Sequence, residues 1–338
     1  MGGFPVFFNN MPKVNYIGIH YCGLTGQIPE WIGSVTSLRS LVLSNNNFDG
    51  SLPAGMSSLT LLEDFYLDDN NVSGDIAVLK SLTSIKHLVL EDNILEGQLT
   101  DEMVQNWQNL EVLDISHNRI ASSIPAVLFS LPNVKILDLH GNSLSGSIPA
   151  PTGSNTVLEI LTLNENELDG PVPSELGTFV SLKQLDVSRN KLTSTLPDSL
   201  SALKQLEFFY AAENPLNAAA IPSFLAELTA LKELSLKNTK CVDTIPDWFG
   251  GLSSLKLLDL DNNRLVGTIP DSLASATALE YLLLQRNELT GEIPASLAAL
   301  DKLGRFAFPF AVNRWQLLPQ NAHSRRLCCA AFFSQPFL

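Results

Sequence analysis

Two histidines are the side chains of this sequence whose type and spacing come closest to a reactive centre. His117 and His140 are predicted on neighbouring strands, with Asp114 and Asp138 close to them. A zinc site needs three or four ligands held in a fixed geometry. The alternative is that both histidines occupy solvent-facing strand positions in the segments DISHN and DLHGN. We favour this alternative and predict no metal site.

Other reactive arrangements do not emerge from the sequence. No motif suggests a Ser-His-Asp arrangement, and the glycines are spread at regular intervals instead of forming a loop that holds a phosphate. Cys22 and Cys241 occupy regular positions of a repeat, so we interpret both as small buried residues. We therefore predict that the chain is not an enzyme and binds no cofactor.

The composition limits the kinds of partner. The chain has 338 residues, a net charge of −14 and an apolar fraction of 45%. This negative charge argues against binding to nucleic acid or to an anionic membrane surface. No apolar run approaches the roughly 18–20 residues that cross a bilayer. Any attachment to a membrane would therefore depend on a flanking segment.

An asparagine column defines a repeat along most of the chain. Eight of the eleven intervals in this column are 24 residues long, and the others are 23 or 25. Cys22 and Thr239 occupy the column in the first and tenth repeats. Such regularity indicates a repeat array rather than two ordinary domains. The column contains Asn46, Asn70, Asn93, Asn118, Asn142, Asn166, Asn190, Asn214, Asn263 and Asn287.

Each repeat follows the pattern L-x-x-L-x-L-x-x-N-x-L-x-G-x-I-P. The leucines of L-x-L point inward from a short strand, and the asparagine amide can bond backbone groups that the next turn leaves unpaired. Glycine suits a tight backbone path, and proline fits an edge where no N–H is required. One repeat cannot bury its leucines alone, so neighbours must stack. We predict an α/β solenoid with a parallel β-sheet on its concave side.

This pattern resembles the leucine-rich repeat family, in its plant-type 24-residue class marked by L-x-G-x-I-P. The resemblance covers about residues 14–310. It implies short helical or 3-10 segments on the convex side of the solenoid. Repeats three and four lack the proline and have Ala77 and Thr100 instead, while repeat ten has Thr239 and Asp243 for asparagine and glycine.

We expect three parts in the chain. Residues 1–13 form a partial repeat, because the segment Gly2-Gly3-Phe4-Pro5 lies 24 residues before Gly26-Gln27-Ile28-Pro29. Residues 14–310 form the solenoid, with twelve full repeats and the start of a thirteenth. Residues 311–338 no longer follow the pattern and form a non-repeat tail. Both ends therefore resemble cuts through a longer protein.

A column of charges with nearly alternating signs lies just outside the strands. Adjacent strands are about 4.8 Å apart, so each charge meets opposite charges on its neighbours, and such pairs contribute roughly 0.2–1 kcal/mol each. We interpret this column as a structural ladder that fixes the strand register. It comprises Arg39, Glu63, Lys86, Glu111, Lys135, Glu159, Lys183, Glu207, Lys232, Lys256 and Glu280.

Two groups of concave side chains are candidates for binding. The first is an apolar stripe of Val112, Ile136 and Ile160, with further aromatic residues along the same face; the alternative is simple β-propensity. The second is an acidic group around Tyr66 and Asp68; the alternative is a solvated acidic surface. Aromatic side chains are typical interface anchors. The aromatic residues are Phe208, Tyr210 and Tyr281, and the other acids are Asp64, Asp69, Glu91 and Asp92.

The resemblance implies a non-catalytic recognition module of a receptor-like or secreted protein, with a peptide or protein ligand on its concave face. One sequon, Asn71-Val72-Ser73, makes Asn71 a glycosylation candidate. The alternative is an intracellular scaffold or regulatory subunit, which the single sequon and the lack of a paired-cysteine cap favour. The location is extracellular or membrane-associated if the parent protein has a signal peptide, and cytoplasmic otherwise. A catalytic domain on a flanking segment is a third possibility.

Overall fold

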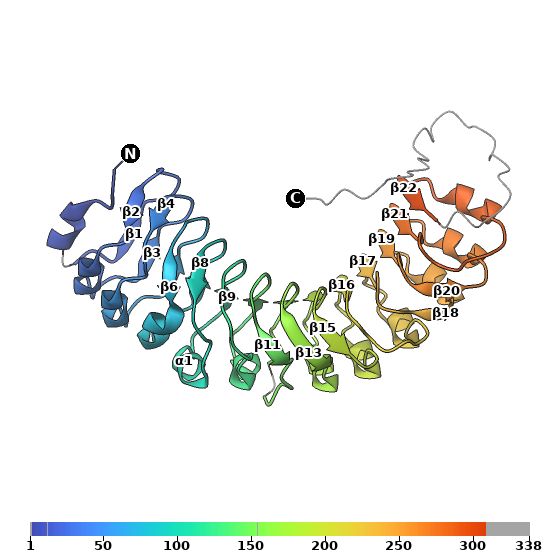
Figure 1. Ribbon diagram of the computed structural model, residues 1–338, viewed down its shortest axis with the longest axis horizontal. Helices are drawn as coiled ribbons and strands as arrows, with labels where there is room; N and C mark the ends of the chain where they lie inside the picture. The colour runs from blue at the N-terminus through green and yellow to red at the C-terminus, as the bar shows by residue number, and fades with distance from the viewer. Residues whose placement is uncertain (1, 12, 154, 309–338) are drawn as a thin grey trace.

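The computed structural model describes residues 2–11, 13–153 and 155–308. In this part of the chain, a 13-stranded parallel sheet lines the concave side of one curved solenoid (Figure 1). The sheet contains β1 (Tyr16–Gly18), β3 (Ser40–Val42), β5 (Asp64–Tyr66), β7 (His87–Val89), β9 (Val112–Asp114), β10 (Ile136–Asp138), β12 (Ile160–Thr162), β14 (Gln184–Asp186), β16 (Phe208–Tyr210), β17 (Glu233–Ser235), β19 (Leu257–Asp259), β21 (Tyr281–Leu283) and β22 (Arg305–Ala307). Successive repeats supply neighbouring strands.

The strands pair in register, so that equivalent residues of successive repeats lie side by side. Leu258 pairs with Leu282, and Leu137 lies between Leu113 and Leu161. The middle residue of each strand is buried, whereas the residues on either side of it face the concave surface. The predicted stacking is confirmed. It produces one continuous hydrophobic core that extends from Phe4 to Phe306.

The asparagine column forms a ladder of hydrogen bonds within the turns. The Asn263 Nδ2 group donates to the carbonyl oxygens of Leu236 and Leu260 at 2.8 and 3.0 Å. Its Oδ1 accepts from the backbone N–H groups of Thr239 and Cys241 at 3.1 and 2.9 Å. One side chain therefore ties its own turn to the preceding repeat, as the sequence predicted.

Short helices line the convex side of the arc (Figure 1), which confirms that prediction. One α-helix, α1 (Asp101–Asn106), occurs in the repeat where Thr100 replaces the proline, and the Thr100 Oγ1 accepts from the Met103 N–H at 3.3 Å as an N-cap. The 3-10 helices are η1 (Val6–Asn10), η2 (Glu30–Ser34), η3 (Ala54–Ser58), η4 (Ile76–Ser81), η5 (Ala126–Ser130), η6 (Ser174–Thr178), η7 (Asp198–Ala202), η8 (Ser223–Glu227), η9 (Asp247–Gly251), η10 (Asp271–Ser275) and η11 (Ala295–Ala299).

A second set of short strands follows the asparagine turns and was not predicted. Several repeats turn at a glycine of the G-x-I-P motif; Gly267 and Gly291 have φ values of 75° and 82°, a left-handed conformation that glycine adopts without strain. These strands form small parallel sheets beside the main one. They are β2 (Thr25–Gln27), β4 (Asn47–Asp49), β6 (Ser73–Asp75), β8 (Ile94–Glu96), β11 (Ser145–Ser147), β13 (Glu167–Pro171), β15 (Lys191–Thr193), β18 (Val242–Thr244) and β20 (Arg264–Val266).

The two cysteines differ in their surroundings. Cys241 is buried as predicted, but Cys22 is exposed, so that prediction was wrong. Cys22 follows β1, an edge strand of the described sheet, and no strand pairs with β1 on its outer side. The predicted tail of residues 311–338 lies outside the described residues. Within the described part of the chain, no helix combines the length and apolar character that crossing a membrane requires.

Candidate functional site

The concave face carries two rows of side chains, because the first and third residues of each strand point away from the core. We call the first residues of the strands the first row and the third residues the second row. Within a row, neighbouring side chains lie on strands about 4.8 Å apart. The predicted concave binding residues belong to these rows except four acids that lie beyond the ends of β5 and β7, namely Asp68, Asp69, Glu91 and Asp92.

The predicted apolar stripe is contiguous in the first row. Val112, Ile136 and Ile160 are directly paired neighbours on β9, β10 and β12. Each is half-buried, so part of each side chain is open to solvent. His87 and Gln184 occupy the same row on the strands that flank the stripe. The stripe is therefore a small aliphatic surface with polar ends.

The structure brings two of the three predicted aromatic residues together. Phe208 and Tyr210 share β16 and are half-buried, and the Lys232 Nζ lies 5.9 Å from the centre of the Phe208 ring. The Tyr210 hydroxyl donates to Glu233 Oε2 at 2.5 Å, and burial, followed by this bond, raises the Tyr210 pKa. Tyr281 is 43% exposed and lies on β21, three strands further along the sheet. Tyr281 is therefore separate from this pair.

The acidic group around Tyr66 is largely occupied by internal contacts. The Asp68 carboxylate accepts from Ser44 Oγ at 2.5 Å, and the Asp64 Oδ1 lies 2.7 Å from the His87 Nδ1. Tyr66 is half-buried, and its pKa is raised by burial and then by the negative charges of Asp64 and Asp68. The group is thus less available to a ligand than the sequence suggested.

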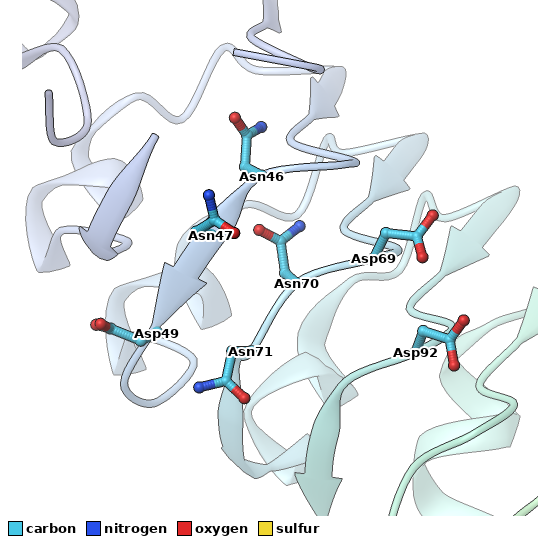
Figure 2. A pocket seen from close by; sticks show the side chains of 7 residues that line it. All are labelled: Asn46, Asn47, Asp49, Asp69, Asn70, Asn71 and Asp92. Atoms are coloured by element: carbon cyan, nitrogen blue, oxygen red, sulfur yellow. The ribbon is translucent and has the colours of Figure 1, made fainter. Parts of the chain in front are cut away.

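Two further acids of this group, Asp69 and Asp92, face a different surface. Asp69 and Asp92 line a shallow hollow of about 470 Å³ on the flank where the strands end (Figure 2). The remaining lining residues are Asn46, Asn47, Asp49, Asn70 and Asn71. Two of these asparagines, Asn46 and Asn70, use their amides in the backbone ladder.

The glycosylation candidate Asn71 belongs to this flank and not to the concave rows. Its side chain is exposed at the edge of the hollow (Figure 2). The sequon hydroxyl, Ser73 Oγ, donates to the Gly50 carbonyl oxygen at 2.9 Å. A glycan on Asn71 would therefore leave the concave rows uncovered, and glycosylation itself stays a prediction.

The two histidines meet, although neither of them is on a strand; His140 lies two residues beyond β10, so its predicted strand position was wrong. His117 has a φ of 47° and occupies the turn position directly before the ladder residue Asn118, so its predicted strand position was wrong. Its Nε2 lies 3.0 Å from the His140 Nε2, while the His140 Nδ1 lies 2.5 Å from Asp138 Oδ1. That carboxylate raises the His140 pKa. Among the described residues, no group of three or more potential ligands is arranged to hold a metal ion.

Sequence reasoning placed Asp114 and Asp138 beside the histidines, but it did not select the aspartates of the second row as residues that bind a peptide. Asp114 and Asp138 are direct neighbours, and Asp186 lies two strands beyond Asp138. Burial raises the pKa of Asp114 and of Asp186. For Asp138, burial is the largest single influence and acts in the same direction, but the hydrogen bonds and charge of His140 together with the Thr162 hydroxyl outweigh it, and the pKa is lowered. The signal in the sequence was an aspartate recurring two residues after the aliphatic stripe positions.

The predicted charge ladder is confirmed. Glu63 contacts both Arg39 and Lys86, and hydrogen bonds from Lys86 and then Arg39 lower its pKa. Further pairs along the flank are Lys135–Glu111 at 2.7 Å, Lys183–Glu159 at 2.6 Å and Lys232–Glu207 at 2.5 Å. These bases are engaged with their own ladder and do not neutralise the second-row aspartates.

Two family models, both described as leucine-rich repeat, match the chain. One matches residues 83–144 and 224–289, and the other matches residues 37–59 and 181–203. A search of curated protein sequences gave no match.

Solved structures of plant receptors have the same architecture. A plant peptide hormone receptor, RGFR1 in complex with RGF2, is 32% identical, with 90% of this chain and 48% of that chain covered and a TM-score of 0.83. The PEPR1–AtPEP1 structure is 30% identical over 91% of this chain and 44% of that chain, with a TM-score of 0.86. The Arabidopsis receptor kinase HAESA, in complex with the peptide hormone IDA and the co-receptor SERK1, is 27% identical over 91% and 51%, with a TM-score of 0.81. The chain thus spans about half the length of these structures.

Proposed function

Because the chain belongs to the leucine-rich repeat family, in its plant-type 24-residue class, we propose that it is a non-catalytic recognition module of a receptor-like or secreted protein. Its ligand is a peptide or a protein segment that lies along the concave sheet. The observation that carries this proposal is the contiguous stripe of partly open aliphatic side chains on an in-register sheet, with Phe208 two strands beyond it in the same row.

The dimensions of the sheet suit such a ligand. Thirteen strands at about 4.8 Å spacing give an arc of roughly 58 Å between the first and the last strand. An extended peptide along this arc has the length to reach the roughly 1,000 Å² of buried surface expected of a specific complex. Because the stacked repeats already hold the backbone of the sheet in place, the solenoid loses little conformational entropy when a peptide binds.

Similar proteins support the same ligand class. The structures of RGFR1 with RGF2 and of HAESA with IDA are titled as peptide hormone complexes. In this chain, a net charge of −14 disfavours nucleic acid as a partner. His117 and His140 contact each other, and His140 also contacts Asp138, so no reaction is proposed for them.

A selection from a random-peptide phage library on the immobilised chain tests this proposal. Selected peptides are synthesised, and their affinities are measured by calorimetry against Ile136→Asp, Phe208→Asp and a convex control, Ala202→Asp, which lies at the end of η7. We expect about a tenfold or greater loss for at least one concave variant, because a buried unpaired charge opposes apolar contact, and no loss for the control. Peptides that bind all three variants as tightly as the unmodified chain would refute concave binding.

A further inference from the structure

The second row contains a segment with little compensating positive charge. Asp114, Asp138, Thr162 and Asp186 occupy consecutive strands β9, β10, β12 and β14, and we call them the acidic row. Glu91 approaches the same segment and, after burial, Asp114 makes the largest contribution to raising its pKa. The like charges therefore face one another across strands, which is unfavourable without a counter-charge.

The internal partners of this row hold the carboxylates in place but do not neutralise all of them. Asp138 has His140 as its partner. Asp114 accepts from the Ser116 N–H and Oγ at 3.0 and 2.6 Å, and Asp186 accepts from the Ser188 N–H at 2.8 Å. Of the described lysines and arginines, none forms an ion pair with Asp114 or Asp186. Both carboxylates are thus oriented by neutral donors and keep their charge available.

Thr162 is a neutral and buried member of the row, and it adds no positive charge to it. It lies between Asp138 and Asp186 in the register and is 6% exposed. Its hydroxyl lies near Asp138, but it makes no hydrogen bond of normal length and angle with any described residue. Buried polar atoms in folded proteins nearly always have a partner. Asp138 is the group nearest to this hydroxyl, which is shielded from solvent, so a ligand can reach the carboxylates of the row but not this atom.

The aliphatic stripe runs beside the acidic row on the same strands. Val112, Ile136 and Ile160 are two residues before Asp114, Asp138 and Thr162, which places the two lines roughly 7 Å apart. A ligand that covers one line therefore also reaches the other. Covering the stripe removes water from the row and strengthens any charge pair formed there.

From this juxtaposition we infer that the ligand is a peptide segment carrying a lysine or arginine beside an aliphatic or aromatic residue. The apolar side chain packs on the stripe, and the cationic group lies on the acidic row, within reach of either Asp114 or Asp186. Arginine fits best, because its planar fork can bond the neighbouring carboxylates of Asp114 and Asp138 at once. This inference rests on the proposed concave binding and specifies the ligand chemistry at its centre.

Matched variants are available for the test. Asp114→Asn with Asp186→Asn removes two charges, while the asparagine oxygens can still accept from Ser116 and Ser188. Asp259→Asn is the control, since Asp259 belongs to the second row, accepts from the Asp261 N–H at 3.0 Å in the same way and lies on β19, three strands beyond β14. Peptides from the same phage selection serve as the probe, together with versions in which each Arg or Lys is replaced by Gln.

The expected result is selection of peptides with a basic residue next to an apolar one. The double variant should weaken them about tenfold or more, the Asp259→Asn control should not, and the Gln peptides should be insensitive to the double variant. Peptides that lose affinity with Ile136→Asp or Phe208→Asp, yet bind the double variant or carry no basic residue, would overturn this inference while leaving concave binding intact. An equal loss with Asp259→Asn would also overturn it, as a general charge effect. Failure of all concave variants to matter would overturn both proposals.

Discussion

Replacing Asn263 by alanine probes the hydrogen-bond ladder that holds successive turns together. The Asn263 side chain is 8% exposed, and its Oδ1 is the acceptor for the backbone N–H groups of Thr239 and Cys241. Alanine leaves both N–H groups without an acceptor in a buried turn. The three carbonyl oxygens that lose the amide N–H should add little to the loss of stability, because under-satisfied carbonyls are better tolerated than unpaired N–H groups.

The magnitude follows from the number of groups left unpaired. Each unsatisfied buried polar group costs about 1–3 kcal/mol, so the two N–H groups lower the free energy of unfolding by about 2–6 kcal/mol. Asn263→Thr should be intermediate, since a threonine already occupies this column at Thr239 and its hydroxyl bonds within its own turn, to Leu236, at 2.7 Å. The loss should be largest around repeats ten and eleven, because each repeat contacts chiefly its neighbours.

Urea denaturation followed by circular dichroism gives the change in stability, and amide hydrogen exchange locates it. Both are needed because a repeat array need not unfold in a single step. Arg264→Ala is the control, since this exposed side chain follows Asn263 directly and should change stability by no more than about 0.5 kcal/mol. If Asn263→Ala were as mild as this control, the ladder would not be a source of stability and the reasoning would be refuted.

Three further substitutions test the electrostatics and the turns. Glu63→Gln should lower the free energy of unfolding by at most about 1 kcal/mol at neutral pH. Because the pKa of Glu63 is lowered, its contribution is present above the ordinary glutamate pKa and disappears as the pH falls through the folded-state pKa. Thermal melts of both proteins from acid to neutral pH measure this change. Asp114→Asn should raise Tm by about 1–2 °C at neutral pH, since the raised pKa of Asp114 means that stability is lost as the pH rises through the folded-state value; a lower Tm for the variant at neutral pH would contradict this. Gly267→Ala should lower the free energy of unfolding by about 1–2 kcal/mol, because φ is 75° and the new Cβ would lie 2.9 Å from Thr244 Cγ2. In the same urea titration, the control Gly251→Ala should be nearly neutral, because its new Cβ meets open space.

The repeat itself could be deduced from the sequence, and with it most of the fold. Leu258 and Leu260 were predicted to be buried and Asn263 to bond the turn, and the structure agrees. Such predictions succeed because every repeat specifies the same local geometry. One atypical residue therefore does not obscure the pattern that the other repeats define. The charge ladder was predictable for the same reason, since in-register strands place Lys135 beside Glu111.

Only the tertiary structure decided which concave side chains are free to bind. Asp68 and Tyr210 were predicted as binding residues, yet each is bonded to a neighbouring repeat, at Ser44 and Glu233. The exposure of Cys22 likewise depends on what stacks beside it. The sequence determined the repeating backbone because that information is local, whereas the availability of each surface group depends on rotamers and on the residues that the adjacent coil places within reach. For this reason the aliphatic stripe was visible in the sequence, and the role of the acidic row beside it was not.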